Sequence, residues 1–268
     1  MNKRVLITGV SKNIGKSICE KFIAEGYEVF GTYKSFFDEE ENRKIFLSEL
    51  KNVTLFKVDL SNCIDVSNFI NEMKKYKFDV IINNAGTLNM TDDNMVLNEF
   101  SNFDIDAFVD LIYCNFISVA QICIELKDCI KNNGNIVIIS SESGSNGAFA
   151  SISYNASKAA LINLTKSLSN NFAYHNKIRV NCVSPGWVET QNGKMNTNSS
   201  NLFVQKIAKV TPMRRNAKPK EIADVVYYLT TDEASFITGA NIIVDGGYSN
   251  FDVIYYEEGF QKSLLAED

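Results

Sequence analysis

Histidine and proline are scarce in this sequence of 268 residues: His175 is the only histidine, and there are three prolines. A single histidine, with no tight cluster of Cys, His and carboxylate residues, makes a zinc site hard to assemble and a Ser-His-Asp triad a poor candidate. We therefore expect no metal in the chemistry. The few prolines, with no repeat and no Gly/Ser linker, favour one domain.

Paired cysteine motifs are also missing, because no two cysteines form a CxxC pair and most lie within apolar helical or strand patterns. This placement predicts buried free thiols rather than disulfides or metal ligands. The six are Cys19, Cys63, Cys114, Cys123, Cys129 and Cys182.

An export leader and a membrane span are not expected either. The first strand pattern begins by residues 3–5, and no apolar run approaches the length of a membrane span. Lys and Arg number 27 against 32 Asp and Glu, a net charge of -5, with the two signs interspersed. We expect a cytoplasmic, soluble protein with neither a membrane nor a nucleic acid as partner.

The sequence does contain a regular alternation of two patterns. Short, nearly all-apolar runs rich in β-branched residues predict strands, and segments of helical period lie between them. This order predicts an α/β fold, a Rossmann-like doubly wound sheet of seven parallel strands with helices on both faces. The predicted strands lie near residues 4, 28, 53, 78, 134, 178 and 240, and the predicted helices at 14–26, 38–51, 63–76, 104–132, 154–174 and 219–231.

The segment TGVSKNIG, residues 8–15, follows the first strand and opens the first helix. Amides at such a helix N-terminus can hold a pyrophosphate. Gly9 would allow the tight turn and Gly15 the close packing of helix on strand, while Asn13 tolerates a left-handed backbone better than other non-glycine residues. The spacing alone is weak evidence, because turns of this composition are common.

Four more motifs follow in order: NNAG at 83–86, Ser141, YNASK at 154–158 and PGWVET at 185–190. With TGVSKNIG they resemble the short-chain dehydrogenase/reductase family over nearly the whole chain. Within that family the sequence most resembles the 3-oxoacyl-acyl-carrier-protein reductase type. The resemblance implies an oxidoreductase that reduces a ketone or 3-oxo group of a small molecule to a secondary alcohol.

The resemblance also implies how the chain is organised. A Rossmann domain would cover 1–250, with a dinucleotide half at about 1–135 and a catalytic half at about 136–250. Residues 251–268 would form a C-terminal extension that the pattern does not place. Family members pair through the segments that correspond to 104–132 and 154–174, so we expect a homotetramer or homodimer.

A nicotinamide dinucleotide is the cofactor that the resemblance implies. Asp59 would accept a hydrogen bond from the adenine amine, Lys158 would hold the nicotinamide ribose, and Val188 and Thr190 would hold the carboxamide. The implied cofactor-binding residues are Gly9, Ser11, Lys12, Asn13, Ile14, Gly15, Lys34, Asp59, Leu60, Asn84, Ala85, Gly86, Tyr154, Lys158, Pro185, Gly186, Val188 and Thr190.

The choice between NADP(H) and NAD(H) depends on charge at the end of the second strand. An acid there binds the ribose diol and repels a 2′-phosphate, and GTYKS at 31–35 has none. Lys12 and Lys34 offer cations to the phosphate, so NADP(H) is favoured. In the alternative, the lysines are solvated surface charges, Asp38 reaches the diol, and NAD(H) is the cofactor.

Tyr154 and Lys158 are four residues apart and therefore share one helical face. A neighbouring ammonium and a nicotinamide cation would both favour the phenolate, so we expect a lowered pKa for Tyr154. In the reducing direction the phenol would give its proton to the carbonyl oxygen.

Two more residues complete the implied catalytic set of Asn115, Ser141, Tyr154 and Lys158. Ser141 would orient and polarise the carbonyl, whereas the adjacent Ser140 is expected to be structural. Asn115 matches the family asparagine that kinks its helix and holds a water that feeds protons toward the lysine.

The sequence departs from the family pattern at two places. The chain is several residues longer between Gly86 and Asn115, mainly at 87–103, which leaves an acyl-carrier substrate open. Arg214, in TPMRRNAKPKEIA, stands where glycine is usual; Arg214 and Arg215 could receive an acidic group or form a solvated turn.

Two other functions remain open from the sequence. One is an NAD-dependent dehydrogenase of secondary alcohols or sugars that works in the oxidative direction. The other is a non-catalytic module that senses the dinucleotide, which we disfavour because the chain retains both Tyr154 and Lys158.

Overall fold

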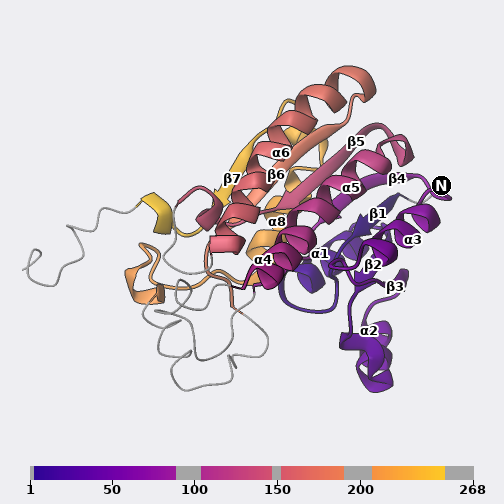
Figure 1. Cartoon of the computed structure of the whole chain (residues 1–268), viewed down its shortest axis with the longest axis horizontal. Coiled ribbons are helices and arrows are strands. Elements are labelled where there is room, and N and C mark those ends of the chain that lie inside the picture. Colours follow the sequence, from indigo (N-terminus) through magenta and orange to yellow (C-terminus); the bar gives the residue numbers. More distant parts are fainter. Residues whose placement is uncertain (1–2, 89–103, 147–151, 190–206, 251–268) are drawn as a thin grey trace, which may run out of the picture.

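A sheet of seven parallel strands forms the centre of the protein (Figure 1). The computed structural model describes residues 3–88, 104–146, 152–189 and 207–250. The strand order is β3-β2-β1-β4-β5-β6-β7, so the chain reverses its direction of winding between β1 and β4. The doubly wound α/β fold and all seven predicted strands are confirmed: β1 Arg4–Ile7, β2 Glu28–Tyr33, β3 Val53–Lys57, β4 Phe78–Asn83, β5 Ile130–Ile139, β6 Arg179–Pro185 and β7 Asn241–Val244.

Helices cover both faces of the sheet, as Figure 1 shows. Helices α3, α5 and α6 pack on one face, and α1, α2 and α8 pack on the other. The helix bounds are α1 Asn13–Ala24, α2 Glu40–Glu49, α3 Cys63–Met73, α4 Ile105–Ile112, α5 Ser118–Glu125, α6 Ile152–Asn176 and α8 Pro219–Tyr228.

The strands are apolar on both sides because each side faces a helical layer. In β4, for example, Ile81 belongs to the core under α3, α5 and α6, whereas Val80 and Ile82 belong to the core under α1 and α8. Alternate residues of a strand point to opposite faces, so burial on both faces requires a continuous apolar run.

The predicted helix at 104–132 is wrong as a single element. The chain forms α4, then a π-helical turn at Tyr113–Ile117, then α5, and it enters β5 at Ile130. Asp104 caps α4 by accepting hydrogen bonds from the amides of Asp106 and Ala107. The predicted helix extended beyond the end of α5 because residues 126–132 also include apolar side chains. These side chains pack in the core just before and within β5, and their spacing resembles a continued helix.

The expectation that no apolar run approaches a membrane span is also wrong by length and composition. The stretch Ile105–Glu125 is long enough, with a mean hydropathy of 1.8. It is weak evidence for a membrane, because a core helix of a soluble protein passes the same test. Here Leu111, Val119 and Ile122 are buried within the protein.

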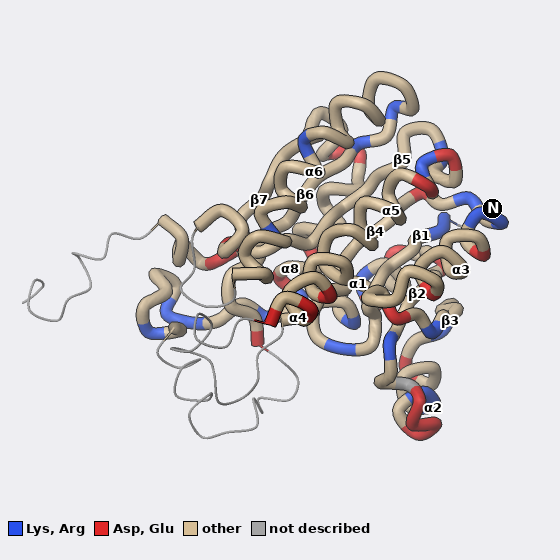
Figure 2. Tube along the Cα trace, viewed as in Figure 1, with Lys and Arg blue, Asp and Glu red and all other residues tan. Residues whose placement is uncertain are grey.

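Cysteine burial agrees with the prediction at most positions. All six thiols are free; Cys19, Cys123, Cys129 and Cys182 are buried, Cys114 is half-buried and Cys63 is exposed. Charged residues of both signs are scattered over the elements rather than gathered by sign, as Figure 2 shows.

The Arg214 turn explains why glycine is usual at this position. Arg214 has a φ of 57°, in the left-handed region that glycine adopts without steric cost. Next to it, Arg215 forms a two-pronged ion pair with Glu221, with both N–O distances at 2.7 Å. Of the two open interpretations, the structure favours a self-contained turn.

Arg214→Gly should therefore raise the free energy of unfolding by about 1 kcal/mol, because it relieves the left-handed backbone. Urea titration followed by circular dichroism measures the change. Arg215→Gly is the matched control and should destabilise the protein by losing the Glu221 ion pair. Equal effects of both substitutions would contradict strain at Arg214.

Candidate active site

The loops after β1 and β4 are joined by hydrogen bonds at the point where the strand order reverses. The Asn84 side-chain amide donates to the carbonyls of Thr8 and Gly9, both at 3.0 Å. The Thr8 hydroxyl in turn accepts from the amides of Asn84 and Ala85 at 3.0 Å. Ligands of such sheets bind at the carboxyl ends of the strands beside this reversal, so the loops delimit the candidate site.

The loop after β1 has the geometry of a phosphate cradle. Gly9 has a φ of 75° and Asn13 a φ of 50°, so the left-handed backbone allowed for Asn13 is present. A Cβ on Gly15 would lie 1.8 Å from the Gly9 carbonyl oxygen, which excludes any side chain there. The first turn of α1 holds no acidic residue, so its N-terminus suits an anion.

The remaining residues predicted for this half lie around the same edge. Lys12 is exposed just before α1, Ser11 and Ile14 are half-buried, and Leu60 is buried after β3. Residue Gly86 follows Ala85 in the loop after β4, and a Cβ on it would meet Asn115 Oδ1 and Lys158 Nζ, each at 3.3 Å. The backbone at Gly86 therefore lies directly against the side chains of Asn115 and Lys158.

Two ion pairs occupy the ends of β2 and β3. Lys34 Nζ lies 2.8 Å from Asp59 Oδ2, and Lys57 Nζ lies 2.7 Å from Asp38 Oδ2. Burial works against the Asp59 charge, but hydrogen bonds from Lys34 and Ser61 lower the pKa of its carboxyl below the ordinary value. Asp38, the acid that could have reached a ribose diol, is thus paired with a lysine.

Asn115 lies in the π-helical turn and is fully buried. Its side chain exchanges two hydrogen bonds of 2.8 Å with the backbone of Thr87, and its amide also donates to the Ser157 hydroxyl at 3.3 Å. Asn115 therefore fastens the loop after β4 to α6. The helix irregularity expected at this residue takes the form of the π turn.

Lys158 and Tyr154 face each other on α6. The Lys158 Nζ lies 5.5 Å from the centroid of the Tyr154 ring and donates to the Ile139 carbonyl at 3.0 Å. Only 4% of Lys158 is exposed, and burial lowers the pKa of its ammonium from 10.5 to about 8. The sheet thus holds a cation at the inner end of the tyrosine ring.

The pKa of Tyr154 departs from expectation. Burial raises the pKa of the phenol, a hydrogen bond with Ser141 opposes this, and the Glu142 charge raises it further. The expected lowering rested on the Lys158 ammonium together with a bound nicotinamide cation; among the protein's own groups, the cost of burying a phenolate is the largest effect on this pKa. Tyr154 stays a protonated phenol, which is the form that can give a proton.

The two serines after β5 have different hydrogen-bond partners. The Ser140 hydroxyl donates to the Lys158 carbonyl at 2.8 Å, which ties β5 to α6. Ser141 is 7% exposed, and its hydroxyl donates to Glu142 Oε2 at 2.6 Å. Glu142 was missed at the sequence level; an acid between two serines at the end of an apolar strand is the signal that could have found it.

Residues 186–189 follow the carboxyl end of β6, at the same edge of the sheet as Ser141. Pro185 ends β6, and a Cβ on Gly186 would lie 2.7 Å from the Cβ of Asp245. Val188 forms a bridge with Ala217, which fixes its main chain beside the segment before α8. Thr190, the loop at 89–103 and the extension at 251–268 lie outside the described residues.

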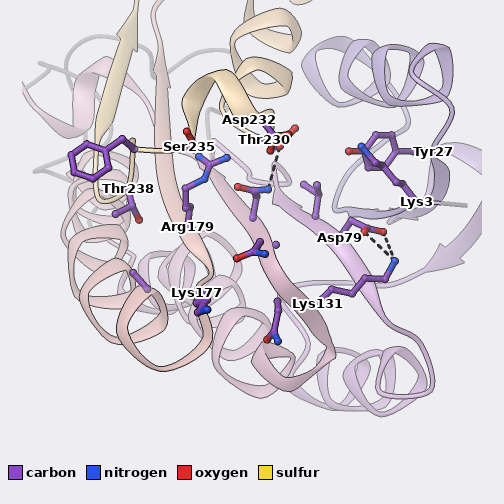
Figure 3. Close-up of a pocket in the computed structure, with 17 residues that line it drawn as sticks. Lys3, Tyr27, Asp79, Lys131, Lys177, Arg179, Thr230, Asp232, Ser235 and Thr238 are labelled. Atoms are coloured by element: carbon purple, nitrogen blue, oxygen red, sulfur yellow. Dashed lines mark hydrogen bonds and ion pairs between the residues drawn. The ribbon is translucent and has the colours of Figure 1, made fainter. Parts of the chain in front are cut away.

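A separate cavity of about 780 Å³ lies at the amino ends of the strands, at the edge opposite Ser141 and Tyr154 (Figure 3). Three of the charged side chains that line it, Asp79, Lys131 and Arg179, are engaged with the protein itself. Lys131 pairs with Asp79 at 2.8 Å, and Arg179 donates to the carbonyls of Leu229, Thr231 and Ile237. The candidate chemistry therefore lies away from this cavity.

Comparison with known families and proteins shows which sequences this chain resembles. Residues 9–249 match the sequence model of a family described as enoyl-(acyl carrier protein) reductase. The chain is 34% identical over 250 residues to the 3-oxoacyl-(acyl-carrier-protein) reductase FabG of Buchnera aphidicola subsp. Acyrthosiphon pisum (strain APS), covering 90% of this chain and 95% of the relative. It is 31% identical over 252 residues to the acetoacetyl-CoA reductase of Rhizobium meliloti (strain 1021), covering 92% and 98%.

Solved structures share the fold. The crystal structure of BdcA in complex with NADPH superposes with a TM-score of 0.80 at 26% identity and covers 96% of this chain and 98% of its own. A short-chain dehydrogenase/reductase from Serratia marcescens BCRC 10948 superposes with a TM-score of 0.80 at 25% identity and covers 92% and 98%.

Lys158→Met should raise the free energy of unfolding at pH 7 by up to about 3 kcal/mol, since each unit of pKa shift corresponds to about 1.4 kcal/mol. The pKa of Lys158 is lower in the folded protein, at about 8, than its ordinary value of 10.5. Its charge therefore destabilises the fold below pH 8, and that cost shrinks as the pH rises toward 10.5. The gain from the substitution should shrink over the same range.

Urea unfolding at several pH values checks this prediction. Lys166→Met is the matched control, because Lys166 is an exposed lysine of the same helix. It should leave the unfolding free energy nearly unchanged at every pH. A destabilised Lys158→Met protein at pH 7 would show that the ammonium stabilises the fold.

Proposed function

The chain belongs to the short-chain dehydrogenase/reductase family, and from this membership we propose that it reduces a ketone or 3-oxo group to a secondary alcohol with NADP(H), Tyr154 being the general acid. The observation that carries the proposal is the convergence of three side chains: Tyr154 is hydrogen-bonded with Ser141, and its ring lies near the Lys158 ammonium, which approaches the backbone of Gly86. Relatives with 31 to 34% identity are named as reductases of 3-oxoacyl-acyl-carrier protein and of acetoacetyl-CoA. Both names describe reduction of a 3-oxo group.

The residues of the chain fit each requirement of this reaction. NADPH, when bound, supplies the hydride that reduces the carbonyl carbon. The Ser141 hydroxyl donates a hydrogen bond that holds and polarises the carbonyl oxygen, and Tyr154 gives that oxygen its proton. Lys158 would hold the nicotinamide ribose.

A protonated Tyr154 suits the role of acid in the reduction. Because burial raises the pKa of the phenol, the proton is present at neutral pH and only has to be transferred. Oxidation of an alcohol would need the phenolate first. The relatives named as reductases favour the reductase over the alternative of an alcohol or sugar dehydrogenase.

The preference for NADP(H) is supported by the charges at the ends of β2 and β3. Lys12 and Lys34 are exposed cations at the edge where the 2′-phosphate would lie. Asp38, the acid available for the diol of NAD(H), is paired with Lys57. A phosphate can share the Lys34 ammonium with Asp59, because three protons point from that nitrogen.

Self-association is supported by an apolar helix face. Ile105, Val109, Ile117 and Ile124 along α4 and α5 are each at least 40% exposed. Exposing such an apolar stripe to water is unfavourable in free energy. Packing against a second copy of the chain, in a homodimer or homotetramer, would bury it. The six free thiols suit the reducing environment of the cytoplasm.

Tyr154→Phe should lower kcat for ketone reduction by at least about a hundredfold, because the proton donor is lost. NADPH oxidation with acetoacetyl-CoA and a panel of simple ketones measures the rate, and fluorescence titration measures NADPH binding, which should persist. Tyr174→Phe changes an exposed tyrosine on the same helix and should leave kcat unchanged. Retained turnover in Tyr154→Phe would overturn the mechanism, and a wild-type protein that binds NADPH without turnover would support the sensing module.

Lys34→Ala should raise the KM for NADPH by about tenfold or more while leaving that for NADH nearly unchanged, because a charge-assisted hydrogen bond contributes about 1.5 to 3 kcal/mol. Steady-state kinetics with both coenzymes gives the ratio. Lys44→Ala is the control, since Lys44 is exposed on α2 and paired with Glu40. A wild-type preference for NADH would count against NADP(H).

A further inference from the structure

Glu142 is a buried acid whose contacts lead directly to the candidate catalytic residues. It is 9% exposed, and the Ser141 hydroxyl donates to its Oε2 at 2.6 Å. The Ser143 hydroxyl lies 2.8 Å from the Ser141 oxygen, and the Ser143 amide donates to that oxygen at 3.3 Å. Nothing in the reduction described above uses this carboxyl group.

A serine hydroxyl has one proton, so Ser141 cannot donate to two acceptors fully at once. When Glu142 is ionised, its carboxylate can only accept, and the short contact to Ser141 takes that proton. The carbonyl oxygen of a substrate is then left without the Ser141 donor. When Glu142 carries a proton, it can donate to the Ser141 oxygen and leave the serine proton free for the substrate.

We propose that Glu142 is a positioning residue that sets the direction of the Ser141 proton, so that the carbonyl group is held for reduction only while Glu142 is protonated. This inference rests on the proposed carbonyl reduction. Glu142 acts through Ser141, whose hydroxyl is the group that meets the substrate.

The surroundings of Glu142 make protonation attainable. Burial raises the pKa of its carboxyl, while hydrogen bonds from Ser141 and from backbone amides oppose this, and the Asp245 charge raises it further. Tyr154 on α6 and Tyr248, after β7, also lie within reach of its charge. The nearby Lys158 ammonium is directed at the Ile139 carbonyl.

The sign of the pH dependence follows. The raised pKa shifts ionisation of Glu142 from its ordinary range toward neutral pH, so activity should decline as the pH rises through that pKa. Above the transition, kcat/KM of the wild-type enzyme should fall by up to about tenfold per pH unit. A second decline at higher pH, from Tyr154 and Lys158, should be common to all variants.

The test is the pH profile of kcat/KM for ketone reduction by the wild type, Glu142→Gln and Glu142→Ala. Neither replacement side chain can ionise, so both variants should lack the first decline. One pH unit above the wild-type transition, each should exceed the wild type by about tenfold relative to their ratio at acid pH. If one of the two variants fails to fold, the other still tests the proposal. Binding of NADPH, measured by fluorescence titration, shows which variants are folded.

Ser143→Ala is the matched control, because it removes a hydroxyl beside Ser141 that cannot titrate in this range. Its profile should keep the first decline. If Glu142→Gln and Glu142→Ala keep the wild-type profile, or lose activity by one factor at every pH, Glu142 has only a structural role and the inference is overturned. A wild-type protein that reduces no ketone overturns the proposed function instead, and the two failures are distinguishable because only the second abolishes wild-type turnover.

Discussion

The reversal of strand order between β1 and β4 is the constraint on which the site depends. The carboxyl ends of the parallel strands lie at one edge of the sheet. Outside this edge, where the strand order reverses, the loops that follow β1 and β4 diverge and leave room for a ligand. In this protein Thr8 and Asn84 tie the two loops together through hydrogen bonds to backbone groups. A Cβ on Gly15 would lie 1.8 Å from the Gly9 carbonyl oxygen and 2.6 Å from the Asn84 side-chain nitrogen, so this close packing requires glycine at position 15.

At this edge the side chains proposed to be catalytic are held by the sheet and by α6. Ser140 and Lys158 bond to each other's elements, the first to the Lys158 carbonyl and the second to the Ile139 carbonyl. Asn115 holds Thr87 and Ser157 from its π-helical turn. The reacting groups therefore sit on rigid elements, and burial sets their protonation: Lys158 becomes a weaker base and Tyr154 a weaker acid than in water.

Family membership and the local chemistry answer different questions about function. The relatives point to reduction of a 3-oxo group, while the charges at the ends of β2 and β3 bear on the coenzyme and Glu142 bears on how Ser141 is used. Glu142 is a local feature, since nothing in the fold requires an acid after the serine. A buried carboxyl costs stability unless it is protonated or accepts hydrogen bonds. The Ser141 hydroxyl donates one of these hydrogen bonds, so the charge of Glu142 and the direction of the Ser141 proton depend on each other.

The sequence by itself determined the order and kind of the elements. A strand buried on both faces requires a continuous apolar run, and a helix packed on the sheet requires apolar residues with a period of about 3.6 residues. It also determined the grouping of Tyr154 with Lys158, which follows from helix geometry alone. Tertiary structure decided the pKa directions, since desolvation depends on what packs around a group: Lys158 could not be known to be buried against Ile139. It also decided the partners of Lys34 and Asp38, the break in the helix at Tyr113–Ile117, and the contact of Glu142 with Ser141, because each depends on segments or rotamers that the linear pattern does not specify.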